Sequence, residues 1–136
     1  MEGEETAPSH VAIIDVDHFK EVNDERGHDE GDRVLTAVAE IVSSSVRRGD
    51  LCGRWGGEEF IIVFRGLDDA SALVERIRST VEAHTFGGAE APLRVTITIG
   101  VASLGDRSFH ETVSAADGAM YIGKREGRNR VVVARG

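Results

Sequence analysis

The sequence holds a single cysteine, Cys52, so it can build neither an internal disulfide nor a metal site made of several thiolates. This cysteine usage fits an intracellular setting. Cys52 lies in an apolar stretch, where we expect a small buried hydrophobic side chain. No apolar run approaches the length of a membrane span and no signal peptide is recognisable, so we expect a cytoplasmic segment without membrane contact.

Basic residues are fewer than acidic ones. The 24 Asp and Glu residues outnumber the 16 Lys and Arg residues, which gives a formal net charge of −8. Non-specific binding to nucleic acid needs a basic surface, so the sequence argues against a nucleic-acid partner. A nucleotide ligand is compatible with this charge, because metal ions can bridge carboxylates and phosphates. The 136 residues suffice for one domain with a real core.

Two apolar runs, residues 51–55 and 60–64, flank the sequence Gly56-Gly57-Glu58-Glu59. This pattern predicts a β-hairpin with a glycine tip. Glycine adopts backbone angles that are closed to other residues, and it lets another molecule approach the main chain. With two carboxylates beside it, the tip indicates a tight pocket next to a place for a hard cation, although a solvent-exposed acidic turn explains the hairpin alone equally well.

A second acidic segment follows the apolar run at residues 10–14, which predicts a buried strand. The strand ends in Asp15-Val16-Asp17, and residues two apart in a strand share a face. We therefore expect the carboxylates of Asp15 and Asp17 to point the same way. Such a pair is costly unless it is solvated, paired or bound to a cation, so a cation site and a solvated strand end are both open.

The rest of the chain shows helical and strand patterns in turn. We expect residues 1–9 to be a disordered leader or the end of a linker. The predicted elements are a short turn or one-turn helix at 18–28 closed by Gly27, an amphipathic helix from about 29–32 that ends at 47–49, a helix at 70–84, a strand at 94–102, a helix at 109–124 and a strand at 131–133. The order β-α-β-β-α-β-α-β predicts an α+β fold with a mainly antiparallel sheet and helices packed on its faces.

Four separated motifs together resemble the GGDEF family, the diguanylate cyclases. The resemblance implies a palm-like βαββαβ core, of the ferredoxin-like and nucleotidyl cyclase type, over residues 10–136. It also implies condensation of two GTP molecules into cyclic di-GMP with release of pyrophosphate. The motifs, in family order, are Asp15-Val-Asp-His-Phe-Lys20 with Asn23-Asp24, Gly27-His28 through Gly31-Asp32, Arg54-Trp-Gly-Gly-Glu-Glu-Phe60, and Ala116-Asp117 through Tyr121, Lys124 and Gly127-Arg-Asn-Arg130.

The resemblance also implies a metal site. Asp15, the main-chain carbonyl of Val16 and Glu58 would hold Mg²⁺, or Mn²⁺ in its place, with Glu59 as a further ligand. Glu58 is in addition the candidate base for the ribose 3′-hydroxyl. Oxygen ligands of this kind suit Mg²⁺, and phosphoryl transfer needs the neutralisation of phosphate charge.

Six further residues match one catalytic position, that of Lys20, and five substrate-binding positions of the family. Lys20 would neutralise charge at the transition state; otherwise it is a solvated surface lysine. The carboxylate of Asp32 suits the donor edge of guanine, but its position before a helical stretch fits a helix cap equally well. The implied contacts are guanine for Asn23 and Asp32, the vicinity of the base for His28, and the β- and γ-phosphates for Lys124 and Arg128.

A second nucleotide site is implied by Arg47-Arg48-Gly49-Asp50, which fits the family's R-x-x-D pattern for binding the inhibitory product. Arg47 and Asp50 are its main residues, and Arg78 on the following helix matches a secondary arginine. Guanidinium groups suit bidentate contacts to phosphate or guanine. A basic helix end followed by an aspartate is the plainer interpretation.

The family's usual N-terminal helix and Asp-x-Leu-Thr-Gly-Leu-x-Asn-Arg segment are missing from the sequence, and we expect an upstream sensor domain to regulate or be fused to this domain. Since each chain would hold one GTP, catalysis requires a homodimer. The alternative function is a non-catalytic module that binds and senses GTP or cyclic di-GMP. A relative that also accepts ATP is disfavoured by Asp32, because a carboxylate repels the acceptor at N1 of adenine.

Overall fold

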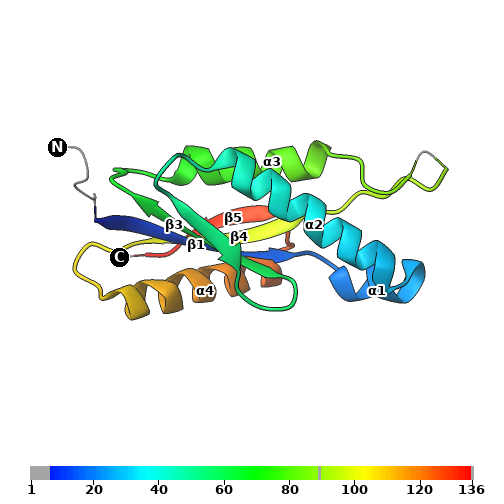
Figure 1. The fold of residues 1–136 in the computed structure, drawn as a ribbon. Helices are drawn as coiled ribbons and strands as arrows, with labels where there is room; N and C mark the ends of the chain where they lie inside the picture. Colours follow the sequence, from blue (N-terminus) through cyan, green and yellow to red (C-terminus); the bar gives the residue numbers. More distant parts are fainter. Residues whose placement is uncertain (1–6, 89, 136) are drawn as a thin grey trace.

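The computed structural model describes residues 7–88 and 90–135. The chain folds into a five-stranded sheet with helices on both faces (Figure 1). The strand order is β2-β3-β1-β4-β5, and every neighbouring pair is antiparallel except β4 and β5. This confirms the predicted α+β class and the mainly antiparallel sheet. The elements are β1 (Pro8–Val16), α1 (Phe19–Arg26), α2 (His28–Ser45), β2 (Leu51–Arg54), β3 (Glu59–Arg65), α3 (Ser71–Ala83), β4 (Ile97–Ser103), α4 (Phe109–Arg125) and β5 (Arg130–Val133).

The central strand β1 is buried along most of its length, because it has a partner on each side and helices above and below. Its side chains alternate between two cores. Ala12, Ile14 and Val16 pack in the larger core with α1, α2 and α3, whereas Val11 and Ile13 pack in the smaller core with α4. Figure 1 shows this arrangement, with α2 and α3 over one face of the sheet and α4 over the other.

Helix α4 lies very close to β4. It begins with a capping box, in which Ser108 and Glu111 satisfy each other's main-chain N–H groups. A Cβ added at Gly100 would overlap the carbonyl oxygen of Ala116, and one at Gly123 would come within 2.7 Å of the Thr98 methyl group. These two glycines therefore set the distance between α4 and the sheet. This distance also determines how close the C-terminal end of α4 lies to β1.

Several element boundaries differ from those predicted. The stretch after β1 is an eight-residue helix, α1, rather than a single turn, and Gly27 ends it with φ 91°. Helix α2 ends at Ser45 because Val46 is extended, so Arg47 and Gly49 lie in a loop and not at a helix end. Strand β4 begins at Ile97, three residues later than expected, since Leu93 pairs instead with Phe86 in an isolated bridge.

The expected leader and the expected burial of Cys52 also need correction. Strand β1 begins at Pro8, so the last residues of the predicted leader are part of the sheet, while residues 1–6 lie outside the described residues. Cys52 is exposed, because β2 is an edge strand whose four residues are all exposed. Among the described residues, no helix is both long enough and apolar enough to span a membrane.

Candidate active site

The two acidic segments meet where β1 ends and the β2–β3 hairpin turns. The main-chain N–H of Val16 donates to the carbonyl oxygen of Glu58 over 3.2 Å, and Asp15 lies opposite Glu59 in the β1–β3 register. The hairpin is therefore attached to the end of β1 by its own backbone. This places the Asp15, Glu58 and Glu59 carboxylates in one region, as the sequence analysis expected.

Electrostatics in this region are unfavourable to ionised carboxylates. Burial raises the pKa of Asp15, and Lys124 opposes this shift. Burial, followed by repulsion from Asp15, raises the pKa of both Glu58 and Glu59, and Asp117 on α4 adds further repulsion to Glu59. The region therefore carries more negative charge than its cations balance.

Lys124 extends from the last turn of α4 and forms an ion pair with Asp15. The period of two along β1 explains this contact: Asp15 shares the face of Val11 and Ile13, which is the face that α4 covers. The Asp15 side chain is 3% exposed and that of Lys124 is 25% exposed. The lysine that the family resemblance assigned to phosphate thus contacts the first carboxylate of the predicted metal site.

The donor types fit a divalent cation, while the side chains are not yet arranged around one. Among the described residues, no group of three or more His, Cys, Asp or Glu side chains is placed to hold a metal ion. Asp15 would have to turn away from Lys124. Burial is the main reason why the pKa values of Asp15, Glu58 and Glu59 are raised, and repulsion from Asp15 adds to it for the two glutamates. A divalent cation would favour the ionised form of all three carboxylates.

The glycine tip is built differently from expectation. The hairpin closes by donation from the Trp55 and Gly56 N–H groups to the carbonyl oxygen of Glu59, at 2.8 and 3.4 Å. Neither Gly56 nor Gly57 has a positive φ, so the turn does not need glycine for its backbone angles. A Cβ added at Gly57 would meet no atom within 4 Å. The expectation that another molecule can approach the main chain at the hairpin tip does fit, because the space beside Gly57 is open.

Helices α1 and α2 carry the predicted guanine-binding residues. Asn23, on α1, places its Oδ1 directly against Gly31, where a Cβ would overlap it. This oxygen is buried and, within the described part of the chain, has no hydrogen-bond partner. His28 and Asp32 are exposed in the first turns of α2. Lys20 is exposed and pairs with Asp24 one turn along α1, at 3.3 Å.

The predicted inhibitory motif forms a loop that is closed by hydrogen bonds between Arg47 and Asp50. Arg47 contacts the Asp50 carboxylate through Nε at 3.0 Å and through a terminal nitrogen at 3.1 Å, and it also donates to the carbonyl oxygen of Arg65. Asp50 in turn accepts the main-chain N–H groups of Arg47 and Arg65. Hydrogen bonds from Arg47 and from the Arg65 main chain hold the pKa of Asp50 below its usual value despite partial burial.

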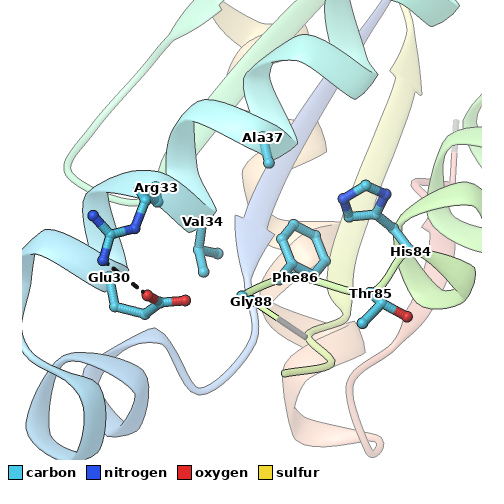
Figure 2. Close-up of a pocket in the computed structure, with 9 residues that line it drawn as sticks. Glu30, Arg33, Val34, Ala37, His84, Thr85, Phe86 and Gly88 are labelled. Carbon is cyan, nitrogen blue, oxygen red and sulfur yellow. Dashed lines mark hydrogen bonds and ion pairs between the residues drawn. The ribbon is translucent and has the colours of Figure 1, made fainter. Parts of the chain in front are cut away.

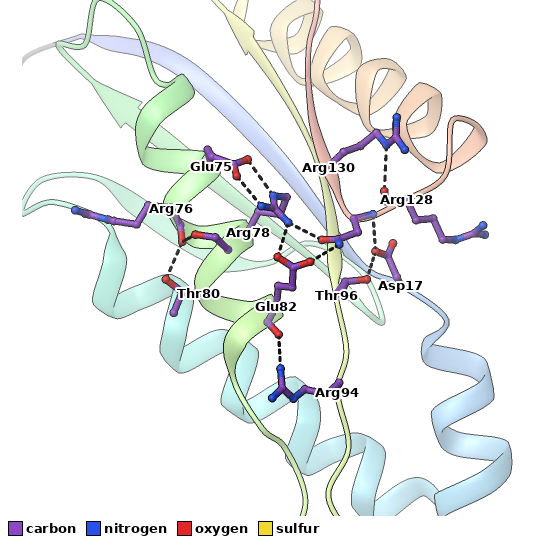
Figure 3. A network of polar contacts seen from close by, with 12 residues as sticks. Asp17, Glu75, Arg76, Arg78, Thr80, Glu82, Arg94, Thr96, Arg128 and Arg130 are labelled. Atoms are coloured by element: carbon purple, nitrogen blue, oxygen red, sulfur yellow. Dashed lines mark hydrogen bonds and ion pairs between the residues drawn. The ribbon is translucent and has the colours of Figure 1, made fainter.

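Asp17 is neither solvated nor turned toward the other carboxylates. Its two oxygens accept hydrogen bonds from the hydroxyls of Thr98 and Thr96, at 2.6 and 2.7 Å, and from the main-chain N–H of Asn129 at 3.0 Å. Figure 3 shows this network reaching Arg78 on α3. Asn129 has no predicted role of its own, although asparagine is one of the few residues besides glycine that readily adopt a left-handed conformation.

A cavity of about 470 Å³ lies away from these residues, between α2 and residues 84–88 (Figure 2). Its wall includes Phe86, His84 and the Glu30–Arg33 ion pair, whose oxygen and nitrogen are 3.0 Å apart. None of the predicted site residues lines it. It is therefore separate from the candidate active site.

Comparison with known proteins finds relatives over nearly the whole chain. The family model described as diguanylate cyclase, GGDEF domain, matches residues 2–130. The chain is 44% identical over 127 residues to diguanylate cyclase DgcM of Escherichia coli, covering 91% of this chain and 30% of that protein. It is 39% identical over 137 residues to diguanylate cyclase A of Treponema denticola, covering 98% and 37%. The chain thus spans about a third of the length of these curated relatives.

Solved structures show the same fold. The active GGEEF domain of a diguanylate cyclase from Vibrio cholerae matches with a TM-score of 0.86 and 38% identity, over 95% of this chain and 84% of that one. The GGDEF domain of DgcB from Caulobacter crescentus, solved in complex with c-di-GMP, matches with a TM-score of 0.87 and 33% identity, over 94% and 78%.

Proposed function

Since the chain belongs to the GGDEF family of diguanylate cyclases, we propose that it condenses two molecules of GTP into cyclic di-GMP. In each half of the reaction, the ribose 3′-oxygen of one GTP bonds to the α-phosphorus of the other and the bond to pyrophosphate breaks. The hydroxyl proton passes to a base. Two such steps close the ring and release two pyrophosphates.

The observation that carries this proposal is the convergence of Asp15 with the hairpin carboxylates. Asp15, the carbonyl of Val16, Glu58 and Glu59 would hold Mg²⁺, or Mn²⁺ in its place. The bound cation would neutralise charge on the phosphate oxygens. The Val16–Glu58 backbone bond of 3.2 Å supports the arrangement, because it fixes both sides of the site independently of the side chains.

Cationic side chains would hold the triphosphate. Lys124 would leave Asp15 and contact the β- and γ-phosphates together with Arg128, and Lys20 would face the charge that develops in the transition state. Glu58 would accept the 3′-hydroxyl proton.

Guanine would be read by Asn23 and Asp32, with His28 nearby. The buried Oδ1 of Asn23 has no partner within the described residues, and an N–H of the base would satisfy it. The exposed Asp32 carboxylate suits the N1 and N2 donors of guanine and would repel N1 of adenine. The site therefore favours GTP over ATP.

Each chain would bind one GTP, so a homodimer would bring two substrates together. Cyclic di-GMP would inhibit by binding Arg47, Asp50 and Arg78. We infer control by an upstream sensor domain that brings the chains together.

The test is incubation with GTP and Mg²⁺ followed by separation of the nucleotides. We expect cyclic di-GMP and pyrophosphate from the parent and no product from Glu58→Gln. A fusion to a dimeric coiled coil removes weak self-association as a cause of failure. Absence of product from that fusion would refute the cyclase proposal, and comparable turnover of ATP would refute the role of Asp32.

A non-catalytic sensor of cyclic di-GMP is the second candidate. The prearranged Arg47–Asp50 pair favours it, since a fixed guanidinium loses little entropy on binding phosphate. Calorimetry with cyclic di-GMP separates the two functions. Tight binding that Arg47→Ala abolishes, without turnover by the fusion, would favour the sensor.

A further inference from the structure

The cavity between α2 and residues 84–88 contains a carboxylate of which only one oxygen is hydrogen-bonded. Glu30 pairs with Arg33 through Oε1 at 3.0 Å, and its side chain is 14% exposed. The second oxygen, Oε2, is buried and has no hydrogen-bond partner within the described residues. Figure 2 shows the carboxylate pointing from α2 toward Gly88. A buried acceptor without a partner is costly, so a ligand that donates to Oε2 relieves this cost.

The Glu30 carboxylate can turn toward the cavity. Its Oε2 lies beside Gly87, where an added Cβ would stand 3.3 Å from it. The last side-chain torsion of glutamate is broad, so a rotation about this bond brings Oε2 to the cavity without a movement of the helix. Arg33 can follow the carboxylate, because its side chain is 69% exposed.

Arg33 supplies hydrogen-bond donors next to this acceptor. A guanidinium has five N–H groups, and among the described residues only Glu30 accepts from one of them, through Nη2. An acceptor and several donors thus lie side by side on one helix. A ligand with an N–H next to a C=O matches this pair. Glu30 would repel a carboxylate or a phosphate, and Arg33 would repel an ammonium group.

The other walls of the cavity suit a flat and mostly apolar body. Val34, Ala37 and Phe86 line it together with the charged pair. The ring of His84 packs against that of Phe86 in an edge-to-face arrangement, with the ring centroids 4.5 Å apart. The volume of about 470 Å³ lies in the range of about 300–1,000 Å³ that is usual for small-molecule sites.

We propose that this cavity binds a small molecule that carries a planar amide, as a primary carboxamide or as part of a lactam ring. An amide N–H donates to Glu30 Oε2, the amide carbonyl accepts from Arg33, and the apolar body lies against Phe86. The residues proposed to bind GTP and cyclic di-GMP do not line this cavity. The site is therefore independent of the cyclase proposal.

Nicotinamide is a suitable probe, because it combines a primary carboxamide with a small aromatic ring and carries no phosphate. Titration of the ¹⁵N-labelled parent, followed by NMR, should move the amide peaks of Gly87 and Gly88, with a Kd of about 1 mM for so small a ligand. Nicotinate has a carboxylate in place of the carboxamide. It should bind at least about tenfold more weakly, since it cannot donate to Glu30.

Variants on α2 test the roles of the charged pair. Glu30→Ala should weaken nicotinamide binding at least about tenfold, and Arg33→Ala should weaken it several-fold. Asp29→Ala is the matched control for Glu30→Ala, because it removes the same charge from the first turn of α2 but lies outside the cavity. This control should bind nicotinamide as the parent does.

Three results would overturn the proposal. The first is that the Gly87 and Gly88 peaks of the parent do not move at about 20 mM nicotinamide, well above the expected Kd. The second is that nicotinate binds as tightly as nicotinamide. The third is that Glu30→Ala and Asp29→Ala bind nicotinamide equally well. Turnover of GTP plays no part in these measurements, so failure here leaves the cyclase proposal intact, and failure of the cyclase proposal leaves this one intact.

Discussion

Lys124 forms an ion pair with Asp15, the most buried carboxylate of the candidate active site. The pair joins the last turn of α4 to the end of the central strand, and it places a cation where the cyclase proposal requires a metal. In the cyclase proposal a metal ion takes the place of Lys124 beside Asp15, and the lysine turns to the phosphates. The ion pair therefore has a testable consequence for stability with and without the metal.

Replacement of Lys124 by methionine should destabilise the metal-free protein by about 1–3 kcal/mol. The substitution leaves Asp15 buried without its cation, and the expected loss lies below that of a fully buried pair because Lys124 is 25% exposed. Saturating Mg²⁺ should shrink the difference, since the metal then compensates Asp15. Urea denaturation with EDTA and with Mg²⁺ measures both values. Equal losses under the two conditions would show that Asp15 does not bind the metal.

Glu58→Gln should make the metal-free protein more stable at pH 7. Burial and Asp15 raise the folded-state pKa of Glu58 above its usual value of 4.5, so the favourable contribution of this carboxyl is fully present below pH 4.5 and is lost as pH rises through the folded pKa. The glutamine of the variant does not ionise, so the variant keeps this contribution to the free energy of unfolding as pH rises. Its advantage in thermal denaturation should vanish by about pH 4.

Mg²⁺ should reverse the order at pH 7, because the metal stabilises the parent by binding its folded state. Glu40→Gln, at an exposed position on α2, is the matched control and should follow the parent. A stability difference for Glu58→Gln that is the same at pH 4 and pH 7 would contradict the raised pKa.

Gly100→Ala should destabilise the fold by at least about 1–3 kcal/mol, because the new Cβ would overlap the backbone of α4 and neither element can move without disturbing the core. Gly118→Ala, on the same helix, is the control. A Cβ at Gly118 meets no atom within 4 Å, and alanine should stabilise the helix by up to about 1 kcal/mol. Urea denaturation of the two variants should give shifts of opposite sign; shifts of the same sign would argue against the close packing.

Gly31→Ala should raise the KM for GTP about tenfold while kcat changes little, with a loss of stability of about 1 kcal/mol. The added methyl overlaps Asn23 Oδ1 and comes within 3.1 Å of Phe19 Cζ, so Asn23 must turn away and would no longer face the base. Asn23→Ala should raise KM similarly. The double variant should behave like Asn23→Ala alone, because both substitutions remove one contact. Additive effects would place the two residues in separate interactions.

The sequence predicted the meeting of Asp15 with Glu58, because a strand end and a hairpin tip can be recognised locally and the family motif pairs them. It could not predict the contact between Lys124 and Asp15. That contact depends on how closely α4 packs on the sheet, which Gly100 and Gly123 determine. Asp17 was left open between a cation and solvent, since Asn129 is remote in the chain. Cys52 was expected to be buried because apolar sequence alone does not reveal an edge strand.

The end of α2 was misplaced for a related reason. Basic residues and a glycine at 47–49 are typical of a helix C-terminus, but Asp50 captures both the side chain and the main chain of Arg47 in a separate loop. A local interaction thus overrides a helix-end signal. The residues concerned are those of the predicted inhibitory motif.

The place of β2 at the rim of the sheet has a dynamic consequence. β1 is paired on both sides, whereas β2 has one neighbouring strand and presents four exposed residues to solvent. Amide protons in β2 should therefore exchange with solvent through small local openings, and those of β1 only through global unfolding. The Asp15 carboxylate on β1 would then keep its position, whereas Glu58 and Glu59 on the hairpin would become ordered around it only when a ligand binds.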